Sequence, residues 1–152
     1  MKSYLLIPLF LISILTESCK PDDSLTGDCF IPSVGVNVTI NMNLPEYFNL
    51  QNLGEFKEIN GGNRGIYLIH NYDDIFYAIE RTCTYQSEND CSRILLDNEI
   101  LQLKCGSMSD TTFVECCPST FSFNSARLGG PALCNLKTYR VSRSGNSLYI
   151  SN

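Results

Sequence analysis

Cysteine thiols are the side chains of this 152-residue chain best suited to metal or redox chemistry, since it has eight cysteines and one histidine. Thiolates bind zinc and iron–sulfur clusters, and paired thiols form disulfides. The one histidine, His70, excludes any site that needs two imidazoles from a single chain. No Cys-x-x-Cys pair occurs, which disfavours a structural zinc site. This cysteine content is high for a reducing cytosol and ordinary for an exported protein.

The overall composition indicates one small folded domain. Hydrophobic residues make up 43% of the chain and charged residues 18%, which is too apolar for a disordered protein. Nucleic-acid-binding proteins usually carry an excess of basic residues, whereas this chain has a formal net charge of −5. No nucleic-acid partner is therefore expected.

The first residues read as an export signal followed by a lipid anchor. Lys2 precedes an apolar run over 4–15, which is too short to cross a bilayer and is typical of a signal-peptide core. The run ends at Ser18-Cys19, which resembles the lipobox of bacterial lipoproteins. This resemblance implies cleavage after residue 18 and lipidation of Cys19, so that the mature protein is attached to a membrane by its N-terminus.

A polar segment separates the anchor from the domain. Residues 19–33 comprise the lipidated cysteine and a tether, and residues 34–152 form the β-domain. Lys20 followed by Asp22-Asp23 resembles the export tag of surface lipoproteins in Bacteroidetes. The expected location is therefore the bacterial outer membrane, on its periplasmic or cell-surface side, with an unknown envelope protein or ligand as partner.

Short strands are predicted throughout the domain. Val34, Val36, Val38, Ile40 and Met42 alternate with small or polar residues, which is the pattern of a strand with one buried face. A loop with a helical turn is expected over 45–53. Turn residues separate further strands, and no window has helical periodicity; the expected strands are 65–70, 75–82, 94–96, 100–104, 112–115, 120–123, 136–141 and 147–150. The chain is therefore predicted to be all-β, an antiparallel sandwich or small, partly open barrel.

Three stretches in order resemble the Rieske [2Fe–2S] domain. They are FYAIERTCTY at 76–85, CCPSTFSF at 116–123, and GGPA at 129–132 followed by a closing hairpin over 136–150. The resemblance covers about residues 62–152. The segments VNVTINMNLPEYFNL and GGNRGIY are more similar to small Bacteroidetes lipoproteins with Rieske-like domains. The resemblance implies two cysteine-bearing loops that face each other at one end of the β-domain.

The cluster ligands implied by this resemblance are degenerate. A Rieske centre needs two cysteines on one iron and two histidines on the other. Cys83 matches the first cysteine, whereas Tyr85 and Cys117 stand at the histidine positions and Val114 at the second cysteine. If a cluster binds, Cys83 and Cys117 are the ligands expected. A cluster with two cysteines and two histidines cannot form in this chain.

The resemblance also implies how some cysteines pair. Rieske loops are joined by a disulfide, and Cys116 and Cys91 lie at or near the corresponding positions. Cys83 and Cys117 would then face each other across the emptied cluster cavity, and we expect them to form a second disulfide in place of the metal.

The remaining cysteines allow one more bridge. With Cys19 lipidated, an odd number of thiols is left, so at least one is free or pairs between chains. Cys29 with Cys134 is the expected third bridge, which leaves Cys105 over.

These observations favour a disulfide-stapled binding or structural module without a cofactor. The alternative is an electron carrier whose [2Fe–2S] cluster is held by four thiolates drawn from Cys83, Cys91, Cys105, Cys116 and Cys117. An enzyme is disfavoured: Ser119 has no candidate base, because His70 is expected at the surface end of a remote strand.

Overall fold

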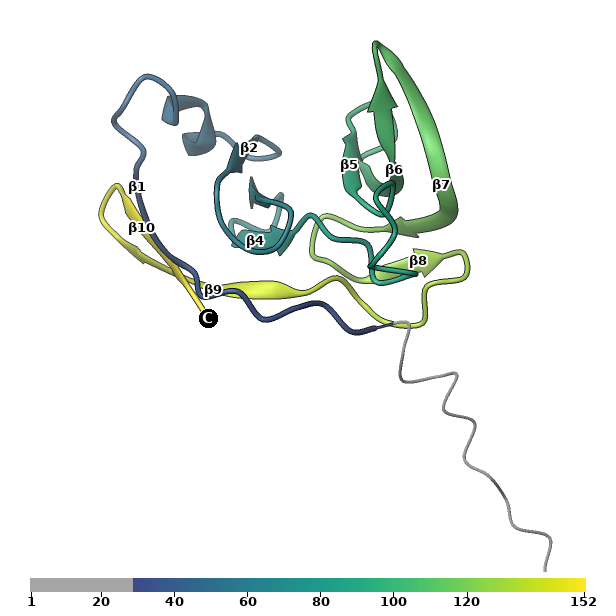
Figure 1. The fold of residues 1–152 in the computed structure, drawn as a ribbon. Coiled ribbons are helices and arrows are strands. Elements are labelled where there is room, and N and C mark those ends of the chain that lie inside the picture. Colours follow the sequence, from purple (N-terminus) through teal and green to yellow (C-terminus); the bar gives the residue numbers. More distant parts are fainter. Residues whose placement is uncertain (1–28) are drawn as a thin grey trace, which may run out of the picture.

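The structure is a computed structural model that describes residues 29–152 (Figure 1). The predicted signal peptide (1–18), the lipidation of Cys19 and the first part of the tether lie outside the described residues. The all-β prediction is confirmed, since ten strands form two antiparallel sheets. Helical structure in the described part is limited to η2 (Phe48–Gln51), a 3-10 turn within the expected loop, and no helix there could cross a bilayer.

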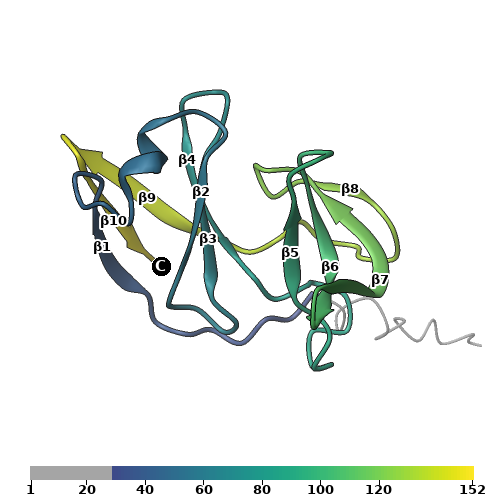
Figure 2. The same cartoon turned by 90° about the horizontal axis from the view of Figure 1, so that it is seen from above.

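The two sheets form neighbouring lobes (Figure 2). The larger sheet has the order β1-β10-β9-β4-β3-β2, and its strands are β1 (Asn37–Asn41), β10 (Ser147–Ser151), β9 (Thr138–Ser144), β4 (Phe76–Glu80), β3 (Ile66–His70) and β2 (Phe56–Ile59). The smaller sheet has the order β5-β6-β7-β8, with β5 (Ile94–Asp97), β6 (Gln102–Ser109), β7 (Thr112–Phe121) and β8 (Arg127–Gly129).

The alternating segment near the start forms the edge strand β1, as predicted. Ile40 and Met42 are buried, and Val36 just before the strand is buried with them. Val34 is 37% exposed, because the pairing of β1 with β10 begins only at Asn37. The strand is therefore shorter at its start than the sequence pattern suggested.

The core is divided into two clusters by strands β3 and β4. Ile66 and Leu68 of β3 face a cluster inside the curled larger sheet, together with residues of β1 and β10. Tyr67 and Ile69 face the opposite way, into a second cluster shared with the smaller sheet. Every residue of β3 is buried because both of its faces are covered, which explains its continuous apolar sequence.

Three features of the strands differ from prediction. The short strands β2 and β8 were not expected, and each has at most one buried residue. The segments 112–115 and 120–123 are not separate strands; the first and the start of the second belong to β7. Pro118 lies between these two segments, in an irregular part of the β6–β7 ladder.

The last residues of the predicted tether are attached to the domain. Cys29 forms a disulfide with Cys134, and the carbonyl of Phe30 accepts a hydrogen bond of 2.6 Å from Ser87 Oγ. From there the chain runs along the base of both lobes to β1 (Figure 1). The attached part of the chain therefore begins by residue 29, before the expected domain boundary at 34.

His70 is a buried residue rather than the surface residue that was expected. Its ring stacks on Phe76, with ring centroids 4.0 Å apart. Nδ1 lies 2.9 Å from the carbonyl oxygen of Leu50, and Nε2 lies 2.9 Å from Asp74 Oδ1. Because the chain around η2 and the turn after β3 supply these partners, His70 ties the end of β3 to both segments.

A buried carboxylate connects the larger sheet to the turn before β3. Glu80 is fully buried, and its two oxygens accept five hydrogen bonds. The donors are the backbone N–H groups of Asn63, Arg64 and Thr82, the Thr82 hydroxyl, and the Tyr139 hydroxyl at 2.6 Å. Every acceptor site is thus used within the protein, which is how a buried charge is tolerated.

We expect the domain to lose stability at alkaline pH. Burial raises the pKa of Tyr67 from 10.0 to about 12, against the opposing effect of the Arg81 guanidinium. The unfolded chain therefore loses this proton before the folded one, so stability is complete below pH 10 and falls as pH rises toward 12. The loss from Tyr67 is on the order of 2–3 kcal/mol. Urea unfolding of the protein and of Tyr67→Phe at pH 8–11.5 checks this, with the exposed Tyr149→Phe as control. Equal losses in Tyr67→Phe and the unaltered protein would contradict the expectation.

Candidate functional site

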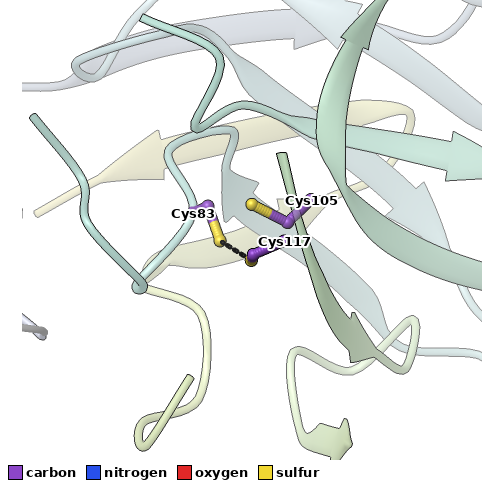
Figure 3. A group of neighbouring side chains, drawn as sticks. All are labelled: Cys83, Cys105 and Cys117. Carbon is purple, nitrogen blue, oxygen red and sulfur yellow. Dashed lines mark hydrogen bonds between the residues drawn. The ribbon is translucent and has the colours of Figure 1, made fainter. Parts of the chain in front are cut away.

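Three buried thiols meet between the two sheets (Figure 3). Cys83 lies in the loop after β4, Cys105 on β6 and Cys117 on β7. Their sulfur atoms all lie within 4.8 Å of one another, and those of Cys83 and Cys117 are 3.9 Å apart. Cys83 and Cys105 are fully buried, and Cys117 is 6% exposed. Among the described residues, this is the cluster whose residue types could bind a metal ion.

An irregularity in the β6–β7 ladder brings two of these thiols together. Lys104 pairs with Thr120 and Gly106 with Glu115, so four residues of β7 lie opposite the single residue Cys105. Such bulges bend a strand and redirect its side chains. Pro118 has no N–H for the ladder and lies in the bulged part. The bulge therefore permits Cys117 to point inward beside Cys105.

The surroundings of the thiols are mostly apolar. All three belong to the cluster that contains Ile94, Leu103 and Phe121. One polar side chain that contacts them is that of Ser119, whose Oγ accepts hydrogen bonds from Cys117 Sγ at 3.2 Å and from the Ala132 N–H at 3.0 Å. Ser119 thereby links the thiol cluster to the Gly-Pro-Ala segment.

The thiols of the cluster differ in acidity because they hydrogen-bond to one another. The pKa of Cys83 is lowered, chiefly because the Cys105 thiol donates to its sulfur; burial opposes this effect, and the Tyr85 N–H and Cys117 assist it. The pKa of Cys105 is strongly raised by its hydrogen bond to Cys83, by burial and by the negative charge of its neighbour. Cys83 is therefore the more acidic of these two thiols.

Gly130 holds the bulge in place from outside. Its φ is +86°, and an added Cβ would collide with the carbonyl of Pro118 and the Cα of Ser119. We expect Gly130→Ala to destabilise the domain by about 3 kcal/mol, from left-handed strain of about 1–2 kcal/mol and overpacking of similar size. Gly145→Ala is the matched control, because its φ is +58° but nothing lies within 4 Å. Equal effects of the two substitutions in urea unfolding would contradict this expectation.

Two disulfides flank the cluster. Cys29 bonds to Cys134, with their Cα atoms 5.9 Å apart, and Cys91 bonds to Cys116, with their Cα atoms 5.6 Å apart. Both pairs were expected. The Cys91–Cys116 bridge joins the two cysteine-bearing loops directly beside the thiols, because Cys116 precedes Cys117.

The expected bridge between Cys83 and Cys117 is not formed in this structure. Their sulfurs are 3.9 Å apart, whereas a disulfide requires about 2.05 Å. Cys105, which was left over from the expected disulfides and was a ligand candidate only in the all-cysteine alternative, contributes a third sulfur to the same space. The predicted disulfide between two cysteines is therefore replaced in the structure by a cluster of three thiols.

The other two predicted cluster positions do not reach the thiols as ligands. Val114 lies on the exposed part of β7 opposite Ser107, and it is 46% exposed. Tyr85 is half-buried, and its hydroxyl accepts a hydrogen bond of 3.4 Å from Gln86. Valine offers no ligand atom, and Tyr85 packs against the apolar cluster that contains the thiols.

These residues do not fit a Rieske [2Fe–2S] cluster. Such a cluster needs four ligands, two for each iron. The site presents three sulfurs in mutual proximity, with an apolar side chain at one ligand position and a phenol at another. The alternative cluster held by four thiolates is disfavoured as well. Two of its five candidate ligands, Cys91 and Cys116, are bonded to each other in a disulfide.

The two sheets and the disulfide-linked loops define a Rieske-like fold, and comparison with solved structures agrees. The chain is similar to the cyanobacterial plasma membrane Rieske protein PetC3 from Synechocystis PCC 6803, with 21% identity and a TM-score of 0.53 over 74% of this chain and 97% of that one. A ferredoxin of carbazole 1,9a-dioxygenase from Nocardioides aromaticivorans IC177 aligns with 16% identity and a TM-score of 0.45, over 78% of this chain and 97% of that one. No protein-family model and no curated protein sequence matches the chain.

Proposed function

We propose that this chain is an envelope lipoprotein whose Rieske-like domain acts as a disulfide-stapled binding or structural module without a standard [2Fe–2S] cluster. The observation that carries the proposal is the composition of the cluster position. Of the four ligand positions, two carry cysteines, Cys83 and Cys117, and the other two carry Tyr85 and Val114. The third thiol beside them, Cys105, comes from β6. The fold is retained while the ligands that define the electron carrier are replaced.

The smaller sheet offers a surface that suits a binding role. A hollow on it combines apolar side chains with the ion pair of Lys104 and Asp97. Its lining residues are Leu95, Leu96, Asp97, Asn98, Glu99, Lys104, Met108 and Phe113. Met108 is 53% and Phe113 36% exposed, near the tip of the β6–β7 hairpin. Exposed apolar side chains grouped in this way are typical of interaction sites. The partner in this proposal is a protein or ligand of the envelope.

The envelope location is supported by the cysteine chemistry. Two disulfides are expected of a protein in an oxidising compartment. The proposed anchor is a lipid on Cys19, which holds the domain at the outer membrane. Incorporation of a labelled fatty acid by the full chain in a bacterial host tests this, with Cys19→Ala as control. Equal labelling of the two chains would reject the anchor.

Native mass spectrometry tests the absence of a cluster. The full chain is isolated anaerobically, in mild detergent and without reductant. We expect a mass without iron or inorganic sulfide and with the hydrogen loss of two disulfides. A mass increase equal to two irons and two sulfides would overturn the proposal and make the chain a redox carrier with unusual ligands.

A further inference from the structure

We propose that the sulfurs of Cys83, Cys105 and Cys117 form a binding site for a single soft monovalent metal ion, Cu(I). This site is distinct from a Rieske cluster in metal, in nuclearity and in ligands, because Cys105 on β6 lies outside both cluster loops. It does not depend on the proposed binding role of the domain surface.

The spacing of the sulfurs matches one ion. Metal–sulfur bonds of about 2.3 Å directed to the corners of a triangle place the sulfurs about 4 Å apart. The Cys83 and Cys117 sulfurs are 3.9 Å apart, and all three lie within 4.8 Å of one another. Each remaining pair has to close by less than about 1 Å to reach the trigonal geometry. Figure 3 shows the three side chains converging from separate segments of the chain.

The number of donors favours Cu(I) over zinc. Structural zinc is bound by four ligands in a tetrahedron. Among the described residues, the group of potential ligands has three members. Ser119 Oγ, which is hydrogen-bonded to Cys117, already accepts two hydrogen bonds. The surroundings of the thiols are otherwise mostly apolar, which disfavours water as a fourth ligand. Thiolates select soft ions, and Cu(I) is fully coordinated by three of them.

The backbone holds the ligands in place before an ion arrives. Cys105 and Cys117 are on paired strands, and the Cys91–Cys116 disulfide joins the chain just before Cys117 to the loop that carries Cys83. Binding is a ligand exchange without electron transfer. Thiol protons are released to solvent as the copper–sulfur bonds form, and copper remains Cu(I) throughout.

The experiment measures copper affinity and coordination in the full chain. The protein, with its disulfides intact, is titrated anaerobically with Cu(I) in competition with a chromophoric Cu(I) chelator. X-ray absorption of the loaded protein then reports the ligands. We expect one Cu(I) per chain with a shell of three sulfurs at about 2.3 Å and no oxygen or nitrogen.

Two variants identify the ligands. Loss of a group that only orients a ligand costs 10–100-fold in metal affinity, so Cys105→Ala is expected to weaken binding by more than about 100-fold. Ser119→Ala is the matched control, since it alters a neighbour of Cys117 without removing a sulfur, and its affinity should remain within about 10-fold. The far-ultraviolet circular dichroism of both variants confirms that they are folded.

Several results would overturn the inference. They are a sulfur shell of two, full-strength binding by Cys105→Ala, failure to compete with the chelator, or a third disulfide in the isolated protein. Tighter binding of Zn²⁺ with an oxygen ligand would also reject it. Absence of copper binding rejects this inference alone, whereas iron and sulfide in the isolated chain would reject the proposed function as well.

Discussion

Replacing Glu80 by alanine is expected to destabilise the domain by about 3–5 kcal/mol, because the fully buried acceptor of a hydrogen-bonding network is removed. Five donors point at the two carboxylate oxygens, and three of them are backbone N–H groups that cannot turn away. The Tyr139 hydroxyl is buried as well, and burial together with Glu80 raises its pKa, so it remains a neutral donor at any physiological pH. Urea unfolding followed by circular dichroism measures the loss.

Glu115→Ala is the matched control for this prediction. Glu115 is also a strand carboxylate, on β7, but it is exposed, and no hydrogen bond or ion pair joins its side chain to another described residue. Surface substitutions of this kind usually change stability by about 0.5 kcal/mol or less. A loss below about 1 kcal/mol for Glu80→Ala would contradict the prediction, because it would mean that the buried network relaxes or admits water.

Removing the bridge between Cys29 and Cys134 is expected to cost about 3–5 kcal/mol. The bridge spans a separation of 105 residues, and restricting so long a loop in the unfolded chain corresponds to about 4.8 kcal/mol in the chain-entropy treatment. The double variant Cys29→Ser, Cys134→Ser removes the bridge without leaving a reactive thiol. Unfolding under non-reducing conditions, compared with the unaltered protein, measures the change.

The disulfide between Cys91 and Cys116 provides a comparison for this prediction. Cys91 and Cys116 are 25 residues apart, for which the same treatment yields about 3.5 kcal/mol. The double serine variant at these positions should therefore be less destabilised, by about 1 kcal/mol. A reversed order would mean that native contacts around the loops, rather than loop length, govern the contribution of each disulfide.

Much of the fold could be predicted because its signals are local. The alternation from Val36 to Met42 places apolar side chains on one face of a strand, and the turn at 71–74 joins two apolar runs that pair as β3 and β4. The strand β2 could not be found in this way. Within Phe56–Ile59 only Ile59 is buried, and the strand forms because β3 provides a partner.

The site was predicted in part. The Rieske resemblance identified Cys83 and Cys117 as facing residues, but it assigned nothing to Cys105. The meeting of Cys117 with Cys105 depends on the bulge at 116–119, which is a property of the β6–β7 pairing and not of either strand alone. The Cys83–Cys117 disulfide was predicted because only these two sulfurs were expected in the cavity. The structure places the Cys105 sulfur there as well, and all three thiols are free.

The attachment of Cys29 to Cys134 also determines how the domain would respond to mechanical tension. A pull applied to the chain ahead of Cys29 passes through the disulfide to Cys134, in the segment between β8 and β9. The edge strand β1, held to the sheet by its pairing with β10 alone, is bypassed and would not be peeled away. The force is thus transmitted through the covalent disulfide bond. When the domain is pulled from its N-terminus, β1 would remain paired with β10 in the larger sheet.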